Sequence, residues 1–303
     1  IFFDDQGNFD WTKTEAKLAP KLAKTNKAVI PGFYGSMPNG TIKTFSRGGS
    51  DVTGSIVARA AKAKLYENWT DVSGCLICDP RIVNNPEPIK TITYRELREL
   101  AYMGATVLHE DAIFPVRAAG IPVNIKNTNQ PEDRGTMIVS ESAEHCDHII
   151  TGIAGKKGMS VINIEKDKMN SEIGFGKNVL RALEKSNVSF EHMPSGVDTM
   201  SVVIATEALA GKETAIIDEI KSRVHPDQIY IESNLALIAV VGRGMKSARG
   251  TAAILFSALA DARVNIKMID QGSSELNIIV GVEEEDFEVA IKAIYKRFIG
   301  INQ

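Results

Sequence analysis

An anion-binding turn is indicated by the residues Thr44-Phe45-Ser46-Arg47-Gly48-Gly49-Ser50-Asp51. Two adjacent glycines let the backbone turn sharply and come close to a ligand. With a strand before the turn and a helix after it, free amides at the helix start attract negative charge. The guanidinium of Arg47 is suited to a carboxylate or a phosphate. An ordinary strand-to-helix turn with a surface arginine fits the same residues, so this pattern alone leaves both interpretations open.

Two other groups of residues have the spacing of metal ligands. Cys75 and Cys78 are separated by two residues, but no second pair follows, and small residues packed at a strand end explain them better. The run His145-Cys146-Asp147-His148 lies in a polar stretch, where a solvated linker is the better explanation. We therefore predict no metal site, and three cysteines are too few for a disulfide framework.

Alternating strands and helices are expected to position the glycine turn. The pattern predicts strands at residues 27–30, 41–45, 67–71, 76–77, 123–125 and 136–139, and helices at residues 52–65, 94–105 and 108–119. Ser50 or Asp51 can cap the first helix, and Thr93 and Glu96 form a capping box for the second. This order predicts an α/β layer with a largely parallel sheet. Ligands of such sheets bind beyond the carboxyl ends of strands, where residues 47–51 and Asp71 fall.

From about residue 149 the order of elements changes to two similar units. The first has strands at residues 159–165, 188–193, 199–206 and 228–231 and helices at residues 174–185 and 213–224, which is a βαββαβ unit. The second has strands at residues 235–241, 264–269 and 276–282 and helices at residues 249–262 and 286–298, so its last strand is missing. Because an open sheet edge is a liability, we expect residues 149–154 to complete it, which makes the first unit an insertion within the second.

Composition is typical of a globular protein of two or three domains. The chain has 303 residues, of which 44% are hydrophobic and 24% charged, with a net charge of -3. The absence of a basic patch makes nucleic acid an unsuitable partner. No apolar run has the length of a membrane span and no signal peptide is visible, so we expect a cytoplasmic location and no membrane partner.

Several motifs along the chain agree with one family. They are Phe45-Ser46-Arg47-Gly48-Gly49-Ser50-Asp51, Thr70-Asp71-Val72, Asp79-Pro80-Arg81, Arg98-Glu99-Leu100-Ala101-Tyr102-Met103-Gly104-Ala105, Val107-Leu108-His109 and Gly120-Ile121-Pro122-Val123. With these motifs the chain resembles aspartate kinases of the amino-acid kinase superfamily. The two repeats resemble the paired ACT modules of those enzymes, with Gly174-Phe175-Gly176, Pro194-Ser195-Gly196 and Val264-Asn265-Ile266 in the expected places.

The resemblance implies an α/β fold and a division into domains. Residues 1–143 are expected to form the C-terminal part of an amino-acid kinase αβα sandwich. Two ferredoxin-like βαββαβ ACT domains are expected to follow. The first is an inserted domain at residues 158–232, and the second comprises residues 146–157 together with residues 233–303.

The resemblance also implies an activity, the ATP-dependent phosphorylation of the L-aspartate side-chain carboxylate to 4-phospho-L-aspartate, with Mg²⁺ associated with the substrate. Arg47 is expected to pair with the substrate α-carboxylate, and Asp51 to orient the amine. The implied substrate-binding residues are Arg47, Gly48, Gly49 and Ser50, and the nucleotide-binding residues are Thr70, Asp71, Asp79 and Arg81. A helix cap remains an alternative role for Asp51, and a plain turn remains one for Asp79-Pro80-Arg81.

The chain departs from the family pattern at three places. No Lys-Phe-Gly-Gly loop occurs, although the family holds the transferred phosphate with it, so we expect the chain as given to be catalytically inactive. In that form it would serve only as an amino-acid-binding regulatory and dimerisation module. Thr106 stands where the family has lysine, and Cys75 and Leu76 replace the tyrosine after Gly74, which indicates a branch that holds ATP differently.

Regulation by an amino acid is implied by the ACT resemblance, with lysine, alone or together with threonine, as effector and a homodimer formed through the ACT domains. The start of the helix near Gly174 offers amides to an α-carboxylate, and Glu191 offers a carboxylate to an ammonium group. The alternative is that these are ordinary loop residues and that Glu191 is a solvated surface charge. The expected effector-binding residues are Met169, Ser171, Glu172, Gly174, Phe175, Gly176, Glu191, Pro194, Ser195, Gly196, Asn265 and Ile266.

Overall fold

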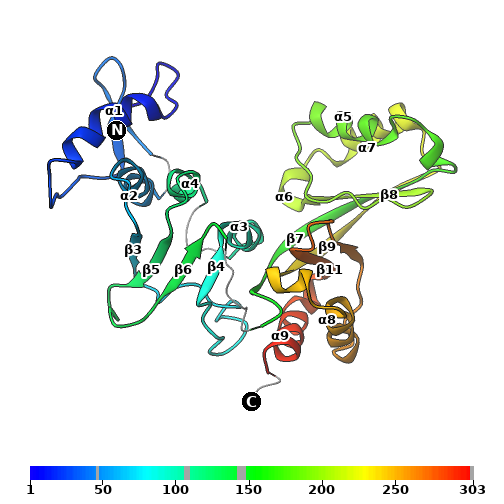
Figure 1. Ribbon diagram of the computed structural model, residues 1–303. Helices are drawn as coiled ribbons and strands as arrows, with labels where there is room; N and C mark the ends of the chain where they lie inside the picture. The colour runs from blue at the N-terminus through cyan, green and yellow to red at the C-terminus, as the bar shows by residue number, and fades with distance from the viewer. Residues whose placement is uncertain (46–47, 106–109, 142–147, 301–303) are drawn as a thin grey trace. The chain divides into compact units, whose positions relative to one another are not determined.

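The computed structural model describes residues 1–45, 48–105, 110–141 and 148–300. The chain forms two compact units (Figure 1). The first unit contains residues 1–80 and 84–147, and the second contains residues 81–83 and 148–303.

A four-stranded sheet in the order β3-β5-β6-β4 lies at the centre of the first unit. Its strands are β3 (Tyr66–Thr70), β4 (Thr91–Thr93), β5 (Val123–Asn127) and β6 (Thr136–Val139). The pairs β3–β5 and β4–β6 are parallel, whereas β5 and β6 are antiparallel. The sheet is therefore mixed rather than largely parallel, because β5 and β6 follow each other with only a short connection, which suits antiparallel pairing.

In the described residues of the first unit, four helices and a small hairpin accompany this sheet. The helices are α1 (Trp11–Leu22), α2 (Gly49–Ala60), α3 (Tyr94–Tyr102) and α4 (Glu110–Ala118), and the hairpin joins β1 (Tyr34–Ser36) to β2 (Ile42–Thr44). Helices α2 and α4 pack together, with the Val116 amide donating to Ser55 Oγ at 3.2 Å. The predicted capping box is confirmed, because Thr93 Oγ1 accepts from the Glu96 amide and Glu96 Oε2 accepts from the Thr93 amide.

Further predictions for the first unit are wrong. Residues 27–30 form no strand; Val29 is fully exposed there, and a short apolar run becomes a strand only where a partner strand pairs with it. Helix α2 begins at Gly49 rather than at Val52 and has Gly48 as its N-cap with no side-chain cap, so neither Ser50 nor Asp51 is the cap. The left-handed conformation of Gly48 (φ 60°) starts the helix earlier than a side-chain cap would.

A five-stranded antiparallel sheet in the order β10-β11-β9-β7-β8 forms the frame of the second unit. Its two central strands, β7 (Gly152–Glu165) and β9 (Gln228–Val241), have 14 residues each and run its whole length. The others are β8 (Thr199–Ala205), β10 (Met268–Asp270) and β11 (Asn277–Glu283). The β7–β9 ladder shifts register between Lys156 and Val161, near Gly158 and Asn234, both at positive φ.

Helices cover the two ends of this sheet separately (Figure 1). At one end, here called the α5/α7 end (residues 159–232), lie α5 (Phe175–Lys185) and α7 (Glu213–Val224), with the short α6 (Thr206–Leu209). At the other, the α8/α9 end (residues 152–157 and 235–298), lie α8 (Thr251–Asp261) and α9 (Phe287–Phe298). In the first of these ends Ile162, Ile204 and Leu183 are among the buried residues of one continuous apolar core.

The sequence predicted separate strands where the structure has continuous ones. Residues 152–154, at the start of β7, pair with residues 239–241 of β9, as expected for the segment that was to complete the second repeat. We propose on this basis that the α5/α7 end is an insertion within the domain that forms the α8/α9 end. Residues 188–193 make only one isolated bridge, between His192 and Val203. Of the predicted strand 264–269 only the part in β10 is regular. Both segments lie at sheet edges, where a strand has a partner on one side only.

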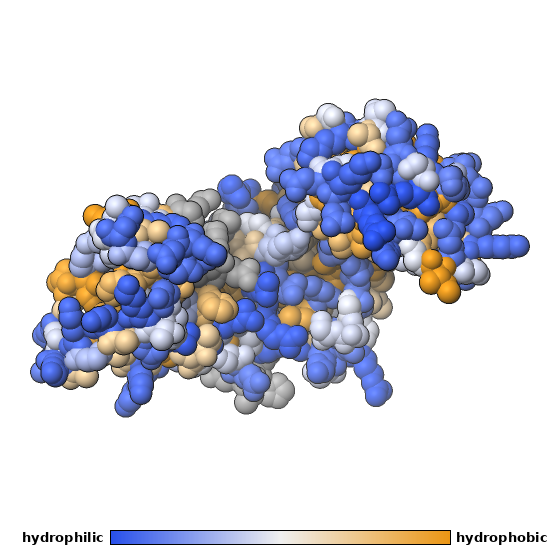
Figure 2. Space-filling view, turned by 90° about the horizontal axis from the view of Figure 1, so that it is seen from above, coloured by the Kyte–Doolittle hydropathy of each residue, from blue (hydrophilic) through white to orange (hydrophobic). Residues whose placement is uncertain are grey.

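The visible surface is mostly hydrophilic, with apolar patches between the charged side chains (Figure 2). Exposed apolar side chains of the α5/α7 end include Ile173, Phe190 and Val197, which are 101%, 39% and 64% exposed. Within the described part of the chain, no helix is long and apolar enough to cross a membrane.

Candidate functional site

The glycine turn has the backbone form that its sequence predicts. Strand β2 ends at Thr44, Gly48 adopts a left-handed conformation, and α2 starts at Gly49. A Cβ atom on Gly49 would lie 2.6 Å from Phe33 Cδ2 and 2.9 Å from Phe45 Cβ, so no larger residue fits there. Ser46 and Arg47 lie outside the described residues.

Asp51 stands in the first turn of α2 and is held from β3. Asn68 Nδ2 donates to Asp51 Oδ1 at 3.0 Å and contacts the Tyr66 hydroxyl at 3.1 Å. The same hydroxyl donates weakly to the Asp51 carbonyl at 3.4 Å. Burial raises the pKa of Tyr66, so its hydroxyl keeps its proton near neutral pH. Asp51 therefore has a fixed orientation.

The expected nucleotide side lies at the carboxyl end of β3. Thr70 ends this strand, and its hydroxyl donates to Asp71 Oδ1 at 3.2 Å. The Thr70 carbonyl accepts from the Thr128 amide at 2.8 Å, which joins the ends of β3 and β5. Ser73 accepts from Asn127 Nδ2 at 2.9 Å, so polar groups of two parallel strands meet at one edge. Because Asn68 lies two residues before Thr70 on β3, this edge also contains Asp51.

The rest of the nucleotide prediction is distributed over both units. Asp79 lies in the first unit, whereas Arg81 belongs to the short segment 81–83 of the second, so its place beside Asp71 stays a prediction. Cys75 and Cys78 are buried thiols, and burial raises their pKa values to about 12 and about 11. Thiols that keep their protons at neutral pH are poor metal ligands. In the ranges the structure describes, no three His, Cys, Asp or Glu residues gather as metal ligands would.

The start of α5 is the second candidate site. Gly174 is its N-cap, at a φ of 87° and without a side-chain cap. A Cβ atom on Gly176 would lie 3.6 Å from Met200 Cε and 3.9 Å from Met193 Cε, so the helix start adjoins the segment before β8. The Asn170 amide donates to the Val197 carbonyl at 3.1 Å. The structure thus brings the predicted residues 169–176 next to the predicted residues 194–196.

Three of the predicted effector residues have other contacts. The side chains of Met169 and Phe175 are 4% and 3% exposed and belong to the core, so only their backbone can face a ligand. Glu172 pairs with Lys166. The sequence of this segment is typical of a surface turn. In the structure, the 3₁₀ turn Met169–Ser171 instead directs the Met169 side chain inward, where it packs in the apolar core.

Glu191 is not a solvated charge. Its carboxylate forms an ion pair of 2.7 Å with Lys156 of β7, and the two side chains are 17% and 22% exposed. Of the other predicted positions, Ser171 and Gly196 are exposed and Ser195 forms an isolated bridge with Met200. Asn265 and Ile266 lie just before β10, at the α8/α9 end, and not at the start of α5.

Several residues of both sites escape sequence reasoning. Tyr66 and Asn68 point to the same face of β3, two positions apart, which a pattern of alternation could have revealed. Lys156 could not be found, because its partner Glu191 is remote in sequence and lies in an irregular segment.

Comparison with known proteins matches a family model to part of each unit. A family model described as the amino acid kinase family matches residues 6–127, and one described as an ACT domain matches residues 238–298. Aspartokinase 3 of Bacillus subtilis is 44% identical over 271 residues, which are 89% of this chain and 60% of that protein. The chain therefore spans about 60% of the length of this curated relative.

Solved structures resemble nearly the whole chain. The crystal structure of Clostridium acetobutylicum aspartate kinase has a TM-score of 0.93 and 60% identity, over 98% of this chain and 69% of that one. Aspartokinase III of E. coli, in complex with aspartate and ADP in the R-state, has a TM-score of 0.75 and 25% identity, over 98% and 69%. The same enzyme in complex with lysine and aspartate in the T-state has a TM-score of 0.76 and 25% identity, over 99% and 67%.

Proposed function

Since the chain belongs to the aspartate kinase family, we propose that the complete protein transfers the terminal phosphoryl group of ATP to the side-chain carboxylate of L-aspartate, giving 4-phospho-L-aspartate. The observation that carries this proposal is the 60% identity to the Clostridium acetobutylicum enzyme over 98% of this chain. The aspartate and ADP in the related E. coli structure support the choice of substrates.

The chemistry requires alignment more than proton transfer. The nucleophile is the carboxylate of the substrate itself, which is ionised at neutral pH and needs no general base. The protein has to hold two anions in line and neutralise charge on the phosphoryl group. A glycine turn at the start of a helix suits this task, because its amides stabilise negative charge without adding side-chain bulk.

We assign distinct roles to the residues around the carboxyl end of β3. Asp51, oriented by Asn68, orients the substrate amine, while the amides of Gly48, Gly49 and Ser50 and the guanidinium of Arg47 take the α-carboxylate. Thr70 and Asp71 take the nucleotide side, joined by Asp79 and Arg81. Mg²⁺ arrives with ATP, and the exposed carboxylate of Asp71 is an oxygen ligand of the type it prefers.

Lysine is the proposed effector, and we place it at the start of α5, with threonine as an additional candidate. The lysine in the E. coli T-state structure supports this choice. The α-carboxylate of the effector meets the amides after Gly174, and its side-chain ammonium group reaches Glu191. These two places are close together, because Glu191 is two residues from Met193, which adjoins Gly176. An effector ammonium has to replace Lys156 at Glu191.

A homodimer formed through the ACT domains, in which the α5/α7 end of one copy meets the α8/α9 end of the other, agrees with the surface of the α5/α7 end. Ile173, Phe190 and Val197 are exposed and lie next to the proposed effector residues in sequence. Apolar side chains that gather on a surface favour association with another surface. A second copy of the chain supplies Asn265 and Ile266 to the effector site in this arrangement.

The test of the proposed activity is an aspartyl-hydroxamate assay of the complete protein with ATP. We expect product that depends on both L-aspartate and ATP and falls at least about 100-fold in Asp51→Asn, because charge and orientation supply most of the rate. The matched control is Asp218→Asn, which changes an exposed aspartate of α7 and should leave the rate unchanged. Product formation that is independent of aspartate would refute the proposal.

A further inference from the structure

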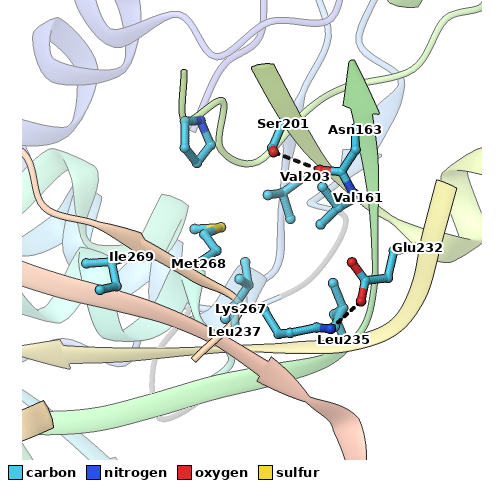
Figure 3. A pocket seen from close by; sticks show the side chains of 12 residues that line it. Val161, Asn163, Ser201, Val203, Glu232, Leu235, Leu237, Lys267, Met268 and Ile269 are labelled. Atoms are coloured by element: carbon cyan, nitrogen blue, oxygen red, sulfur yellow. Dashed lines mark hydrogen bonds and ion pairs between the residues drawn. The ribbon is translucent and has the colours of Figure 1, made fainter. Parts of the chain in front are cut away.

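A pocket of about 120 Å³ lies on the five-stranded sheet of the second unit (Figure 3). Pro194, an expected effector residue, is among the residues that line it, so the pocket adjoins the proposed effector site. Lys267 stands in its wall, with Nζ 2.5 Å from Glu232 Oε1 (Figure 3). The first unit contains a buried polar group that neither candidate site includes, the hydroxyl of Thr136.

The hydroxyl of Thr136 joins two segments of the chain. Thr136 is the first residue of β6 and is 0% exposed. Its Oγ1 accepts from the Cys75 amide at 2.8 Å and donates to the Ile89 carbonyl at 2.6 Å. The Ile89 amide in turn donates to the Cys75 carbonyl at 2.8 Å. The hydroxyl therefore uses its one donor and one of its acceptor sites to hold Cys75 and Ile89 against the sheet.

The backbone at Gly74 lies directly on this hydroxyl. Gly74 has a φ of 113°, and a Cβ atom there would lie 2.3 Å from Thr136 Oγ1 and 2.9 Å from the Thr136 amide nitrogen. No side chain fits in that space, so only glycine allows so close an approach. The loop after β3 thus reaches the sheet through its backbone, at the position where the hydroxyl of Thr136 binds it.

The same loop has a second attachment at Ser73. Ser73 Oγ donates to Asp133 Oδ2 at 2.5 Å, and Asn127 Nδ2 donates to Ser73 Oγ at 2.9 Å. Asn127 ends β5, and Asp133 lies in the turn between β5 and β6. Residues 73–75 are therefore held by two strands and by the turn that joins them.

This loop carries two of the residues that we assign to the nucleotide. Asp71 lies four residues before Cys75 and is exposed, whereas Asp79 lies four residues after Cys75 and is half-buried. A shift of the backbone at Cys75 moves both carboxylates relative to the end of β3. A misplacement of about 1 Å is enough to reduce catalysis about 100-fold.

We propose that Thr136 is a positioning residue for the nucleotide, which acts by fixing the backbone of residues 74–75 and thereby the carboxylates of Asp71 and Asp79. This role rests on the proposed function, which assigns both carboxylates to the nucleotide side. Thr136 itself is fully buried and does not touch the nucleotide. L-Aspartate binds at the turn before α2 in the proposed function, so its binding should not depend on Thr136.

Calorimetric titration of ADP into the complete protein, with Mg²⁺ in excess, tests this role. Thr136→Val keeps the shape of the side chain but leaves a buried amide and a buried carbonyl without their partner. We expect it to raise the Kd of ADP at least about tenfold. Thr136→Ser keeps the hydroxyl and should bind ADP within about twofold of the parent. In the aspartyl-hydroxamate assay, the KM for ATP should rise in Thr136→Val and the KM for L-aspartate should stay constant.

Thr14→Val is the matched control. Thr14 is also 0% exposed, and its hydroxyl also accepts from a backbone amide, that of Phe2 at 2.9 Å. This variant loses a similar buried bond in the same unit and should bind ADP as the parent does. Unchanged ADP affinity in Thr136→Val, or an equal loss of affinity in Thr14→Val, would overturn the proposal.

Ser73→Ala tests the same loop at a half-buried position, should Thr136→Val fail to fold. It removes the second attachment and should raise the Kd of ADP about threefold. Unchanged ADP affinity in Ser73→Ala would then refute the role of the loop.

The ADP titration requires no turnover, so it separates this inference from the proposed function. If the parent bound ADP but formed no aspartyl hydroxamate, the proposed acceptor would be wrong, while a tenfold loss of ADP affinity in Thr136→Val would still support the role of Thr136. A parent protein that did not bind ADP would refute both.

Discussion

Two acidic side chains of the candidate sites are held by a polar residue on a neighbouring strand. Asp51 accepts a hydrogen bond from Asn68 of β3, and Glu191 pairs with Lys156 of β7. The two partners differ in kind, since Asn68 is neutral and Lys156 is charged. A neutral amide orients a carboxylate and leaves its charge available to a substrate, whereas an ammonium group neutralises it.

Replacing Asn68 by leucine should therefore impair the use of aspartate. In the complete protein we expect kcat/KM for aspartate to fall about tenfold, or ~1.4 kcal/mol, which is the cost of one hydrogen bond to a charged group. The KM for ATP should not change, because the nucleotide side does not use this bond. The matched control is Glu67→Gln on the exposed face of the same strand. Equal losses for aspartate and ATP would indicate a general structural defect instead.

Replacing Lys156 by methionine should strengthen effector binding. Glu191 loses the ammonium group that the effector has to displace, so we expect lysine to bind about three to ten times more tightly in calorimetry. The stability cost should be about 1–3 kcal/mol, because the variant removes the ammonium group from a carboxylate that is only 17% exposed. Lys185→Met, which removes the exposed pair with Glu219, is the control. Unchanged or weaker lysine binding would contradict the proposed role of Glu191.

Helix α3 shows how a single cap fixes an element. Thr93 is both the last residue of β4 and the N-cap of α3, so the strand passes directly into the helix. Glu96, fully buried, bonds to the hydroxyl of Thr93 at 2.7 Å and to its amide at 2.9 Å. A change at Thr93 therefore affects the strand, the helix and a buried carboxylate together.

Thr93→Ala should lower the free energy of unfolding of the first unit by about 1–2 kcal/mol, as the loss of a good N-cap does. Thr93→Ser keeps the hydroxyl and should lose less than half of that. Urea unfolding monitored by tryptophan fluorescence measures both variants, because Trp11 and Trp69 lie in this unit. If alanine and serine gave the same midpoint, the hydroxyl would not be the stabilising group.

Elements with a local cause were predictable from the sequence. The capping box of α3 and the bounds of α7 (Glu213–Val224) follow from side-chain chemistry and helical periodicity within a few residues. The continuity of β7 and β9 was not predictable, because Gly158 and Asn234 read as turn residues and instead sit at irregularities within the long strands.

The candidate sites also contain parts that could be predicted from the sequence and parts that could not. The glycines of the turn and the polar carboxyl end of β3 follow from motif and alternation, although the helix after the turn begins at Gly49 rather than at Val52. The pair of Glu191 with Lys156 and the pocket beside Lys267 depend on strands that meet only in the folded sheet. No local pattern carries that information, so these features required coordinates.

At the scale of the whole molecule, the stability of the first unit should depend on pH, because it contains buried groups with raised pKa values. Burial raises the pKa of Cys75 to about 12 from 9.0 and that of Tyr94 to about 12 from 10.0, and both residues lie in the first unit. Above pH 9 the unfolded chain releases these protons while the folded unit retains them. The folded state then binds more protons than the unfolded state, so its stability falls as pH rises.

The Tm of the first unit should therefore fall from pH 9 upward and should stay constant between pH 7 and 8.5. Cys75→Ala should flatten this decline, because it removes a group with a raised pKa. Tyr230→Phe, at an exposed tyrosine of the second unit, is the control and should not change it. The measurement is Tm by tryptophan fluorescence across pH 7 to 11. A decline of equal slope in Cys75→Ala would contradict this origin.

The two long strands also impose an order on folding while the chain is being synthesised. The α5/α7 end comprises residues 159–232 and closes its own ladder once residue 232 has emerged. Residues 152–156, made earlier, have no partner until residues 237–241 follow. Since distant pairings form late, the inserted end folds first and serves as the template on which the other end assembles. A nascent chain paused near residue 235 therefore presents one finished module with an unpaired strand edge, the form in which a growing chain is most exposed to aggregation.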